Sequence, residues 1–498
     1  MKIAMVSSEC EPFAKTGGLA DVVDALARAL GELGHEVDVY LPRYRGLEPP
    51  GPAERTRLEM PAPGVRGTAA ASVDVLSARA DGYRLRLVDH PASFDRANYY
   101  GEGSDYPDNG ARFALLGRAA LETIRAEGGG VAVLHGHDWQ AGPAVLLRDH
   151  VYGSDPVLDG MATMVTCHNL AYHGWVPRER AAALGLPPGV GKADGVDLLR
   201  EEVREADMVN TVSPTYAEES RTPEYGAGLD DVLRERGETY VGILNGIDLR
   251  LWDPETDEAL VERFSTVDLA GKRACKQDLA VRLGVDAFPE SDGRERWGAR
   301  GAPLFGLVGR LDPQKGFDLL TGAAEALVRA GGRIVILGTG DARLIRDLRE
   351  LAERWRDRIV ILERFDRDEA RRIYAGSDLL LMPSRFEPCG QSQMIAMRYG
   401  TIPLVRRTGG LADTVIDADD RPEEGDGFVF TPPDPEALAQ AARRAIAAYR
   451  DETRWAAIVQ RAMDRDFGWT ASAPRYLDAY ERAIAIRARR ERPGSTRR

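Results

Sequence analysis

Residues 2–6, KIAMV, and residues 15–30, KTGGLADVVDALARAL, decide how the chain begins to fold. The first stretch is the short apolar run of a buried strand. The second stretch is predicted to be a helix, because apolar residues recur at the spacing of one helix face: Leu19, Val22, Val23, Leu26, Ala27 and Leu30. Gly31 and Gly34 end this helix, and residues 37–41, VDVYL, start the next strand. The opening is therefore predicted to be a βα unit.

The same alternation of strands and helices restarts after residues 254–301, where charged sequence with glycine and proline indicates a domain boundary. Further strand candidates lie at residues 131–135, 162–167, 208–212, 304–311, 334–338, 359–365, 378–385 and 401–407. Strands that alternate with helices form parallel sheets covered on both faces. The sequence predicts an α/β protein of two doubly wound, Rossmann-like domains that face each other across a deep cleft. We expect domains at 1–253 and 254–475, followed by a helix and a short basic, solvated tail at 476–498.

Composition excludes several classes of protein. The 498 residues include 66 basic and 79 acidic side chains, a formal charge of −13, so binding nucleic acid through the whole surface is excluded. The four cysteines are far apart in sequence, which argues against a disulfide scaffold or a structural zinc site. No apolar stretch approaches the roughly 18 residues of a membrane span. We expect a cytoplasmic protein that binds neither nucleic acid nor membrane.

The sequence Lys15-Thr16-Gly17-Gly18, at the predicted helix start, is a first candidate for binding an anion. Two glycines let backbone N–H groups approach a phosphate, and the helix dipole favours the negative charge. A plain turn would carry the same glycines, so both interpretations stay open. The string TGGLAD recurs at residues 408–413, where a second strand-to-helix turn explains it equally well.

Arg310 and Lys315, in the string GRLDPQKG after an apolar strand, are a second candidate. Both fall at the sheet edge where open α/β folds bind ligands. Arginine offers phosphate oxygens a planar fork and lysine a compact charge. Two fixed cations could stabilise a departing diphosphate without a metal ion, although a surface pair is the simpler reading of the residues alone.

Glu387, in SRFEPCGQSQ, follows another apolar strand and is predicted to lie at the ligand edge of its sheet. A carboxylate there can accept hydrogen bonds from sugar hydroxyls, or it can be a helix-start carboxylate. Backbone N–H groups at the following helix start could assist it, namely those of Gly390, Gln391 and Ser392.

Four of the seven histidines lie in two short segments, HGHDWQAG (135–142) and HNLAYHG (168–174). They could suggest zinc, but no cysteine or acidic residue has matching ligand spacing. Two polar loops that line a pocket are the favoured interpretation, and no metal site is predicted.

These strings together resemble the family of bacterial glycogen synthases and plant starch synthases, which are retaining glucosyltransferases of the GT-B fold. The resemblance covers nearly the whole chain, and DFGWTASAPRYL (466–477) is similar to the family's closing segment. The matching strings, in family order, are KTGGLADVV (15–23), HGHDWQAG, HNLAYHG, NTVSPTYAEE (210–219), GILNGID (242–248), GRLDPQKG (309–316), SRFEPCGQSQ (384–393) and RRTGGLADTV (406–415).

The resemblance implies transfer of glucose from a nucleotide sugar, with ADP-glucose favoured, to the non-reducing 4-OH of an α-1,4-glucan such as glycogen. It implies retention of configuration and no metal or other cofactor. The N-terminal domain would serve the acceptor, the C-terminal domain would bind the nucleotide sugar, and the last helix would cross back onto the N-terminal domain.

By the same resemblance, the catalytic residues are His168, Arg310, Lys315 and Glu387. Lys15 would join the two cations at the donor phosphates, with the N–H groups of Gly18, Gln391 and Ser392. His168 and Asn169 would face the transferred glucose, with Asp21 nearby. The remaining substrate-binding positions are Asp138 and Trp139 on the acceptor side, and Asn245, Cys389 and Gly390.

The chain also departs from related patterns. Many retaining GT-B enzymes have a second glutamate where this chain has Ile395, although the synthase family usually lacks it too. Arg200 stands where relatives usually have lysine, and the loop at 289–300 is longer than the family needs. One alternative is an enzyme that uses UDP-glucose or makes a different glucoside. The other is a catalytically silent sensor, which the presence of Lys15, Arg310, Lys315 and Glu387 disfavours. The sequence is silent on oligomeric state, regulation and chain-length preference.

Overall fold

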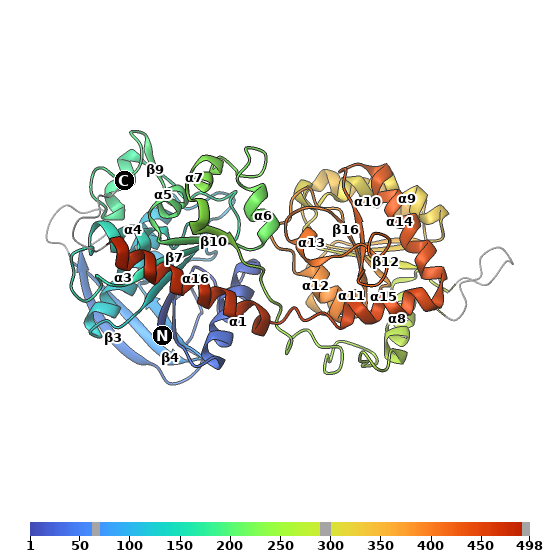
Figure 1. Ribbon diagram of the computed structural model, residues 1–498, viewed down its shortest axis with the longest axis horizontal. Helices are drawn as coiled ribbons and strands as arrows, with labels where there is room; N and C mark the ends of the chain where they lie inside the picture. Colours follow the sequence, from blue (N-terminus) through green and yellow to red (C-terminus); the bar gives the residue numbers. More distant parts are fainter. Residues whose placement is uncertain (62–69, 289–299, 491–498) are drawn as a thin grey trace. The chain divides into compact units, whose positions relative to one another are not determined.

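The computed structural model describes residues 1–61, 70–288 and 300–490, and the chain divides into two compact units (Figure 1). Unit 1 comprises Met1–Gly246 and the segment that begins at Trp469, and unit 2 comprises Ile247–Gly468. The chain therefore changes unit a few residues before each of the boundaries predicted at 253 and 475. Within the described residues, no helix has both the length and the apolar character that crossing a membrane requires.

Unit 1 is built on a nine-stranded sheet in the order β11-β10-β7-β6-β1-β2-β5-β4-β3. Its strands are β1 (Lys2–Val6), β2 (Glu36–Pro42), β3 (Glu54–Pro61), β4 (Ala70–Arg79), β5 (Arg84–Asp89), β6 (Val133–His137), β7 (Ala162–Cys167), β10 (Met208–Thr211) and β11 (Tyr240–Gly242). The expected parallel core is present, but β3 and β4 pair antiparallel at one edge and were not predicted. Charged residues alternate along β3, as is usual for an antiparallel edge strand that faces water.

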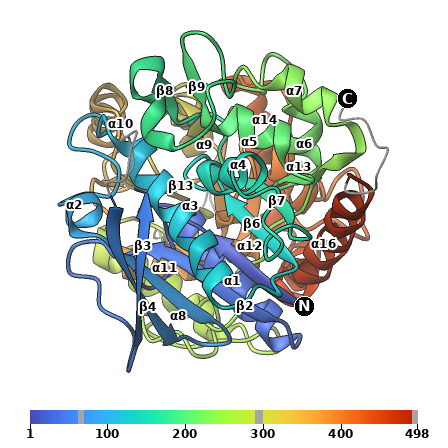
Figure 2. The ribbon, with the colours of Figure 1, turned by 90° about the vertical axis from the view of Figure 1, so that its left-hand side faces the viewer.

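The helices of unit 1 cover this sheet (Figure 2). Its elements outside the sheet are α1 (Gly18–Glu32), α2 (Pro91–Phe94), α3 (Asn109–Ala126), α4 (Gly142–His150), β8 (Trp175–Pro177), η1 (Arg178–Leu184), β9 (Gly195–Asp197), α5 (Leu198–Glu205), α6 (Pro214–Glu219), α7 (Asp230–Glu235), η2 (Gly237–Thr239) and α16 (Trp469–Arg490). Helix α1 forms where the apolar spacing predicts it, and it continues through Gly31 to Glu32.

Helix α16 belongs to unit 1, although it is the last helix of the chain. It contacts β6, β7, β10 and α1, and Tyr476 and Tyr480 are fully buried in the core of the unit. It begins at Trp469, earlier than the predicted start at residue 476. Arg487 is not part of a solvated tail, because its guanidinium lies 2.9 Å from carboxylate oxygens of both Asp149 and Asp207. The remaining basic tail, 491–498, lies outside the described residues.

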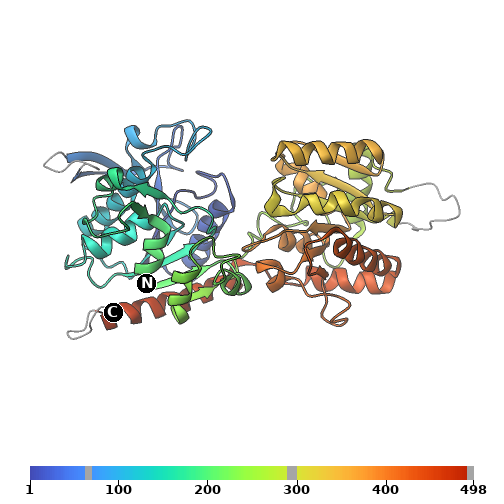
Figure 3. The ribbon, with the colours of Figure 1, turned by 90° about the horizontal axis from the view of Figure 1, so that it is seen from above.

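Unit 2 is built on a six-stranded parallel sheet in the order β14-β13-β12-β15-β16-β17. Its strands are β12 (Leu304–Val308), β13 (Arg333–Leu337), β14 (Ile359–Leu362), β15 (Leu379–Met382), β16 (Ile402–Arg406) and β17 (Phe428–Phe430). Its helices are α8 (Ala270–Leu283), η4 (Pro313–Lys315), α9 (Phe317–Arg329), α10 (Ala342–Arg354), α11 (Arg367–Gly376), α12 (Ser392–Arg398), α13 (Gly409–Thr414), α14 (Pro435–Arg450) and α15 (Glu452–Met463). Figure 3 shows helices on both sides of these strands. The expectation of a doubly wound unit is therefore confirmed.

The segment 254–301, which the weak pattern marked as a boundary, lies inside unit 2 and contains helix α8. The change of unit lies at residues 246–247, just before this segment. Helix α8 buries Lys276 where an amphipathic pattern would have an apolar residue, so the periodic signal is weak. The unusually long loop predicted at 289–300 lies, except for residue 300, outside the described residues.

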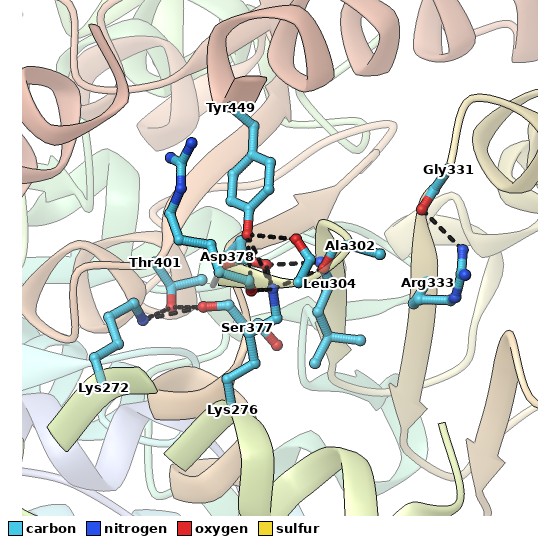
Figure 4. Close-up of polar contacts among 12 residues, drawn as sticks. Lys272, Lys276, Ala302, Leu304, Gly331, Arg333, Ser377, Asp378, Thr401 and Tyr449 are labelled. Atoms are coloured by element: carbon cyan, nitrogen blue, oxygen red, sulfur yellow. Dashed lines mark hydrogen bonds and ion pairs between the residues drawn. The ribbon is translucent and has the colours of Figure 1, made fainter. Parts of the chain in front are cut away.

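Lys276 is the centre of a buried polar cluster in unit 2 (Figure 4). Its Nζ lies 2.6 Å from Oδ2 of Asp378, 2.7 Å from the carbonyl oxygen of Ala302 and 3.0 Å from the hydroxyl of Tyr449. Oδ2 of Asp378 also accepts a 2.8 Å bond from the backbone N–H of Leu304. The cluster therefore joins α8 and α14 to the starts of β12 and β15, which carry the loops described next.

Candidate functional site

Glu9, a residue without a predicted role, organises the glycine loop that precedes α1. Its buried carboxylate accepts from the backbone N–H groups of Thr16 and Gly17, at 2.5 and 3.1 Å, and from the hydroxyl of Tyr100 at 2.5 Å. Two of the N–H groups in the predicted anion site therefore already hold a carboxylate. Neither carboxylate oxygen of Glu9 accepts a hydrogen bond from the backbone N–H of Gly18. A Cβ added to Gly18 would lie in open space.

Lys15 lies next to this loop and is paired with acidic side chains. Its Nζ lies 2.5 Å from Oδ1 of Asp21 and 3.4 Å from the carboxylate of Glu11. The structure thus brings together two predicted site residues, Lys15 and Asp21. A phosphate that approached Lys15 would compete with these carboxylates for its ammonium group.

Asp138 follows β6 and fixes the loop that follows β7. Its Oδ1 accepts from the backbone N–H of His168 at 2.6 Å and of Asn169 at 3.3 Å. Its φ of 55° is a left-handed conformation, which aspartate tolerates better than most residues. Burial raises the pKa of Asp138 to about 7. Asp138 therefore holds the backbone at His168 and Asn169 in place.

Trp139 is buried and packs within unit 1. Its ring meets the ring of Phe113 edge to face, with centroids 5.3 Å apart. It also lies so close to Gly174 that a Cβ there would be 2.2 Å from the indole. Trp139 therefore supports the loop that follows β7, and its contact with an acceptor stays a prediction.

The histidines form hydrogen bonds with one another and with helix α16. Nδ1 of His137 lies 3.1 Å from Nε2 of His168, and the two nitrogens of His135 lie 2.8 Å from the hydroxyl of Tyr480 and 2.7 Å from that of Thr166. Burial lowers the pKa of His135 and of His168 to about 3, so both rings are neutral at physiological pH. No group of three or more histidine, cysteine or acidic side chains in the described parts of the chain is arranged to hold a metal ion.

In unit 2, the loops after β12 and β15 meet because these strands are adjacent and parallel. Nζ of Lys315 lies 2.5 Å from Oε2 of Glu387, which also accepts a 3.0 Å bond from the hydroxyl of Ser384. Glu387 is buried, whereas the side chain of Arg310 is 61% exposed and contacts Asp312 at 3.3 Å. A fixed ammonium–carboxylate pair with an exposed guanidinium nearby in sequence can bind an anion and polar hydroxyls together.

The second TGGLAD copy supports this pair. The backbone N–H of Gly410 donates to the carbonyl oxygen of Glu387 at 3.0 Å. A Cβ on Gly409 would lie 2.0 Å from that same oxygen, and a Cβ on Gly410 would lie 1.9 Å from the carbonyl oxygen of Cys389. The glycines are therefore required for close contact between α13 and the loop that carries Glu387.

Replacing Gly410 by alanine is expected to lower the free energy of unfolding by about 1–3 kcal/mol, because the new Cβ would overlap backbone atoms that must move. The matched control is Gly18→Ala in the first TGGLAD copy, where no atom lies within 4 Å of the Cβ position. Thermal unfolding of the two variants and the wild type measures the difference. Equal melting temperatures for the two variants would contradict the packing role of the second copy.

The remaining predicted residues make other contacts within their own units. Asn245 is buried and accepts from the hydroxyl of Tyr476 at 3.5 Å, and Oδ1 of Asn169 accepts from Ala171 N–H at 3.0 Å. Three further predicted residues lie in one loop of unit 2: Cys389 is buried, Gly390 has a φ of 68°, and Gln391 precedes the first residue of α12.

Ser392, and the departures from related patterns at Ile395 and Arg200, also have defined places. The hydroxyl of Ser392, the first residue of α12, accepts from Tyr374 at 3.0 Å. Ile395 is buried on the same helix. Arg200 donates to the carbonyl oxygen of Gly228 at 3.0 Å and pairs with Asp231. The predicted site residues are divided between the units, with Lys15, Gly18, Asp21, Asp138, Trp139, His168, Asn169 and Asn245 in unit 1 and the others in unit 2.

Known proteins match the chain over almost its whole length. Family models of the starch synthase catalytic domain and of group 1 glycosyl transferases match residues 2–235 and 302–448. A glycogen synthase of Syntrophotalea carbinolica is 40% identical over 98% of this chain and 99% of its own length. A glycogen synthase of Anaeromyxobacter dehalogenans is 43% identical over 96% of this chain and 99% of its own length.

A solved structure shows the same architecture. The catalytic domain of starch synthase IV from Arabidopsis thaliana, bound to ADP and acarbose, has a TM-score of 0.83 and 33% identity, and the match covers 97% of this chain and 99% of that one. These matches confirm the predicted α/β GT-B fold and the resemblance on which it was based. The chain belongs to the family of bacterial glycogen synthases and plant starch synthases and is a glycosyltransferase.

Proposed function

We propose that this enzyme transfers glucose from ADP-glucose to the non-reducing 4-OH of an α-1,4-glucan, with retention of configuration, and so elongates glycogen in the cytoplasm. The observation that carries the proposal is the 2.5 Å contact between Lys315 and Glu387 at the ligand edge of the sheet in unit 2. The names of the relatives support the glucan, and the ADP in the Arabidopsis structure supports the nucleotide.

The cations act on the leaving group. Breaking the glucosyl–phosphate bond leaves negative charge on the diphosphate, and Lys315 and Arg310 stabilise that charge. Lys15 and the N–H of Gly18 add to this stabilisation, after Lys15 exchanges a carboxylate partner for phosphate. The N–H groups of Gln391 and Ser392, at the start of α12, complete the set. With these charges supplied by the protein, the proposed reaction needs no metal ion or other cofactor.

Polar residues at the predicted positions hold the sugar. Glu387 accepts hydrogen bonds from hydroxyls of the transferred glucose, while His168 and Asn169 face it and Asp21 lies nearby. Asp138 and Trp139 serve the acceptor side by holding the loop that carries His168. Asn245, Cys389 and Gly390 complete the substrate-binding positions. In this division unit 1 serves the acceptor and unit 2 the nucleotide sugar.

Retention follows from displacement on the front face of the glucose. In that mechanism the leaving phosphate oxygen takes the proton of the acceptor hydroxyl as the new glycosidic bond forms. The phosphate oxygen that accumulates charge is thus also the base, and the protein positions it with Lys315 and Arg310.

The donor is tested by measuring initial rates of glucose incorporation into glycogen from ADP-glucose and UDP-glucose in parallel, with and without EDTA. We expect a much higher kcat/KM with ADP-glucose and equal rates with and without EDTA. Activity with UDP-glucose alone would mean that the donor is UDP-glucose, as in the alternative function. Loss of activity in EDTA would contradict catalysis without a metal ion. Release of nucleotide without incorporation would contradict the glucan acceptor.

A further inference from the structure

His137 is buried beside His168, and the proposed function gives it no role. Its Nδ1 lies 3.1 Å from Nε2 of His168, and their rings are stacked with centroids 5.4 Å apart. The ring centroids of His135 and His137 are 4.1 Å apart. Nε2 of His137 is buried and has no hydrogen-bond partner among the described residues. Among the residues that the structure describes, His137 therefore makes a single ring hydrogen bond, and that bond is to His168.

The burial of these rings decides how many protons they carry. Desolvation lowers the pKa of His137 well below its usual value, and the neighbouring His135 and His168 lower it further. The pKa of His168 is likewise lowered to about 3. Both rings are therefore neutral, and each has one N–H donor and one acceptor nitrogen. Only one of the two facing nitrogens carries a proton.

The buried Nε2 of His137 decides which nitrogen that is. If His168 donated from its Nε2, the proton of His137 would have to be on its own Nε2, where no described group accepts it. A buried N–H without an acceptor is among the rarest defects in folded proteins, and an unfilled acceptor is tolerated more often. The favoured arrangement therefore has His137 donating from Nδ1 to Nε2 of His168.

We propose that His137 is a positioning residue that holds His168 in the tautomer with its proton on Nδ1. The hydrogen bond made by one ring nitrogen sets the protonation of the other. With Nε2 occupied as an acceptor, Nδ1 of the partly exposed His168 is left as a donor. That N–H donates to a hydroxyl oxygen of the transferred glucose, so the inference rests on the proposed role of His168.

Three substitutions separate this role from packing. In His137→Asn the amide nitrogen can take the place of Nδ1 and donate to His168, whereas in His137→Gln it takes the place of Nε2 and cannot. His137→Phe keeps the ring without any donor. We expect kcat to fall about 10–100-fold in the Phe and Gln variants and to recover most of that loss in the Asn variant, with the KM for the donor changed less than threefold in all three.

The measurements are steady-state kcat and KM for the nucleotide sugar, with thermal melting to show that each variant is folded. If the Phe variant does not fold, the comparison of Gln with Asn remains. Wild-type kcat in the Phe or Gln variant, or an equal loss in Asn and Gln, would overturn the inference. The His168→Ala variant separates the proposed role of His168 from that of His137. If His168→Ala transfers glucose at the wild-type rate, the proposed role of His168 fails as well. If His168→Ala is inactive while His137→Phe is active, only the role of His137 fails.

Discussion

Replacing Lys315 by methionine is expected to lower kcat for glucosyl transfer about 10²–10³-fold, because methionine keeps the length of the side chain and removes the charge. The ammonium of Lys315 is fixed 2.5 Å from Glu387, so it is already in place when negative charge develops on the diphosphate. Loss of one such preorganised electrostatic contact costs about 2.7–4 kcal/mol in the transition state. Steady-state kinetics with saturating glucan measure the effect.

The matched control for this variant is Arg385→Met. Arg385 lies in the same group of loops, but its guanidinium is bound to the exposed Asp318 at 2.6 and 2.7 Å and has no proposed contact with phosphate. We expect its kcat to stay within about threefold of the wild type, in keeping with the small effects of most surface substitutions. A Lys315→Met enzyme as active as the Arg385→Met enzyme would contradict the assignment of the donor site to unit 2.

Replacing Lys276 by methionine is expected to destabilise unit 2 by about 3–5 kcal/mol, the usual cost of leaving one partner of a buried ion pair without the other. Asp378 would keep its bond from Leu304 N–H and lose the ammonium at 2.6 Å. Burial lowers the pKa of Lys276, and Asp378 opposes that shift, so the lysine charge depends on its partner. Hydrogen exchange of the amides in β12 and β15 measures the stability of this part of the unit.

Two further variants make this prediction specific. Arg273→Met removes an exposed positive charge from the same helix, and its effect is expected within about 0.5 kcal/mol. The double variant Lys276→Met with Asp378→Asn is expected to be more stable than Lys276→Met alone, because the uncompensated carboxylate is gone. Exchange rates in Lys276→Met equal to those in Arg273→Met would show that the cluster does not hold the sheet together.

The parts of the fold that follow from local sequence were predictable. The run KIAMV and the apolar spacing from Leu19 to Leu30 predicted β1 and α1, and apolar runs predicted five of the six strands of unit 2, β12 to β16 but not β17. Strand β3 was missed because its signal is alternation of charged and apolar residues at a sheet edge, not an apolar run. Helix α8 was missed because it buries a lysine, which becomes favourable only when Asp378 folds against it.

Contacts between residues that are distant in sequence could not be predicted from single motifs. Position after strands predicted that Lys315 and Glu387 would reach the same sheet edge, and they do meet, although their chemical roles remain proposals. Glu9 was missed because its partners include Tyr100, and no local pattern marks a carboxylate that accepts from a glycine loop. The packing role of Gly410 depends on the backbone of Cys389, which only the folded structure brings close.

The fate of labelled glucose is the most direct test of the proposed transfer to glycogen. Glycogen is incubated with the enzyme and ADP-[¹⁴C]glucose, isolated, and digested with β-amylase, which releases maltose from the non-reducing ends of α-1,4-glucans. Transfer to the non-reducing 4-OH predicts that the label enters glycogen and is released as maltose. Label that resists digestion, or no incorporation while ADP is released, would contradict transfer with retention to the non-reducing 4-OH.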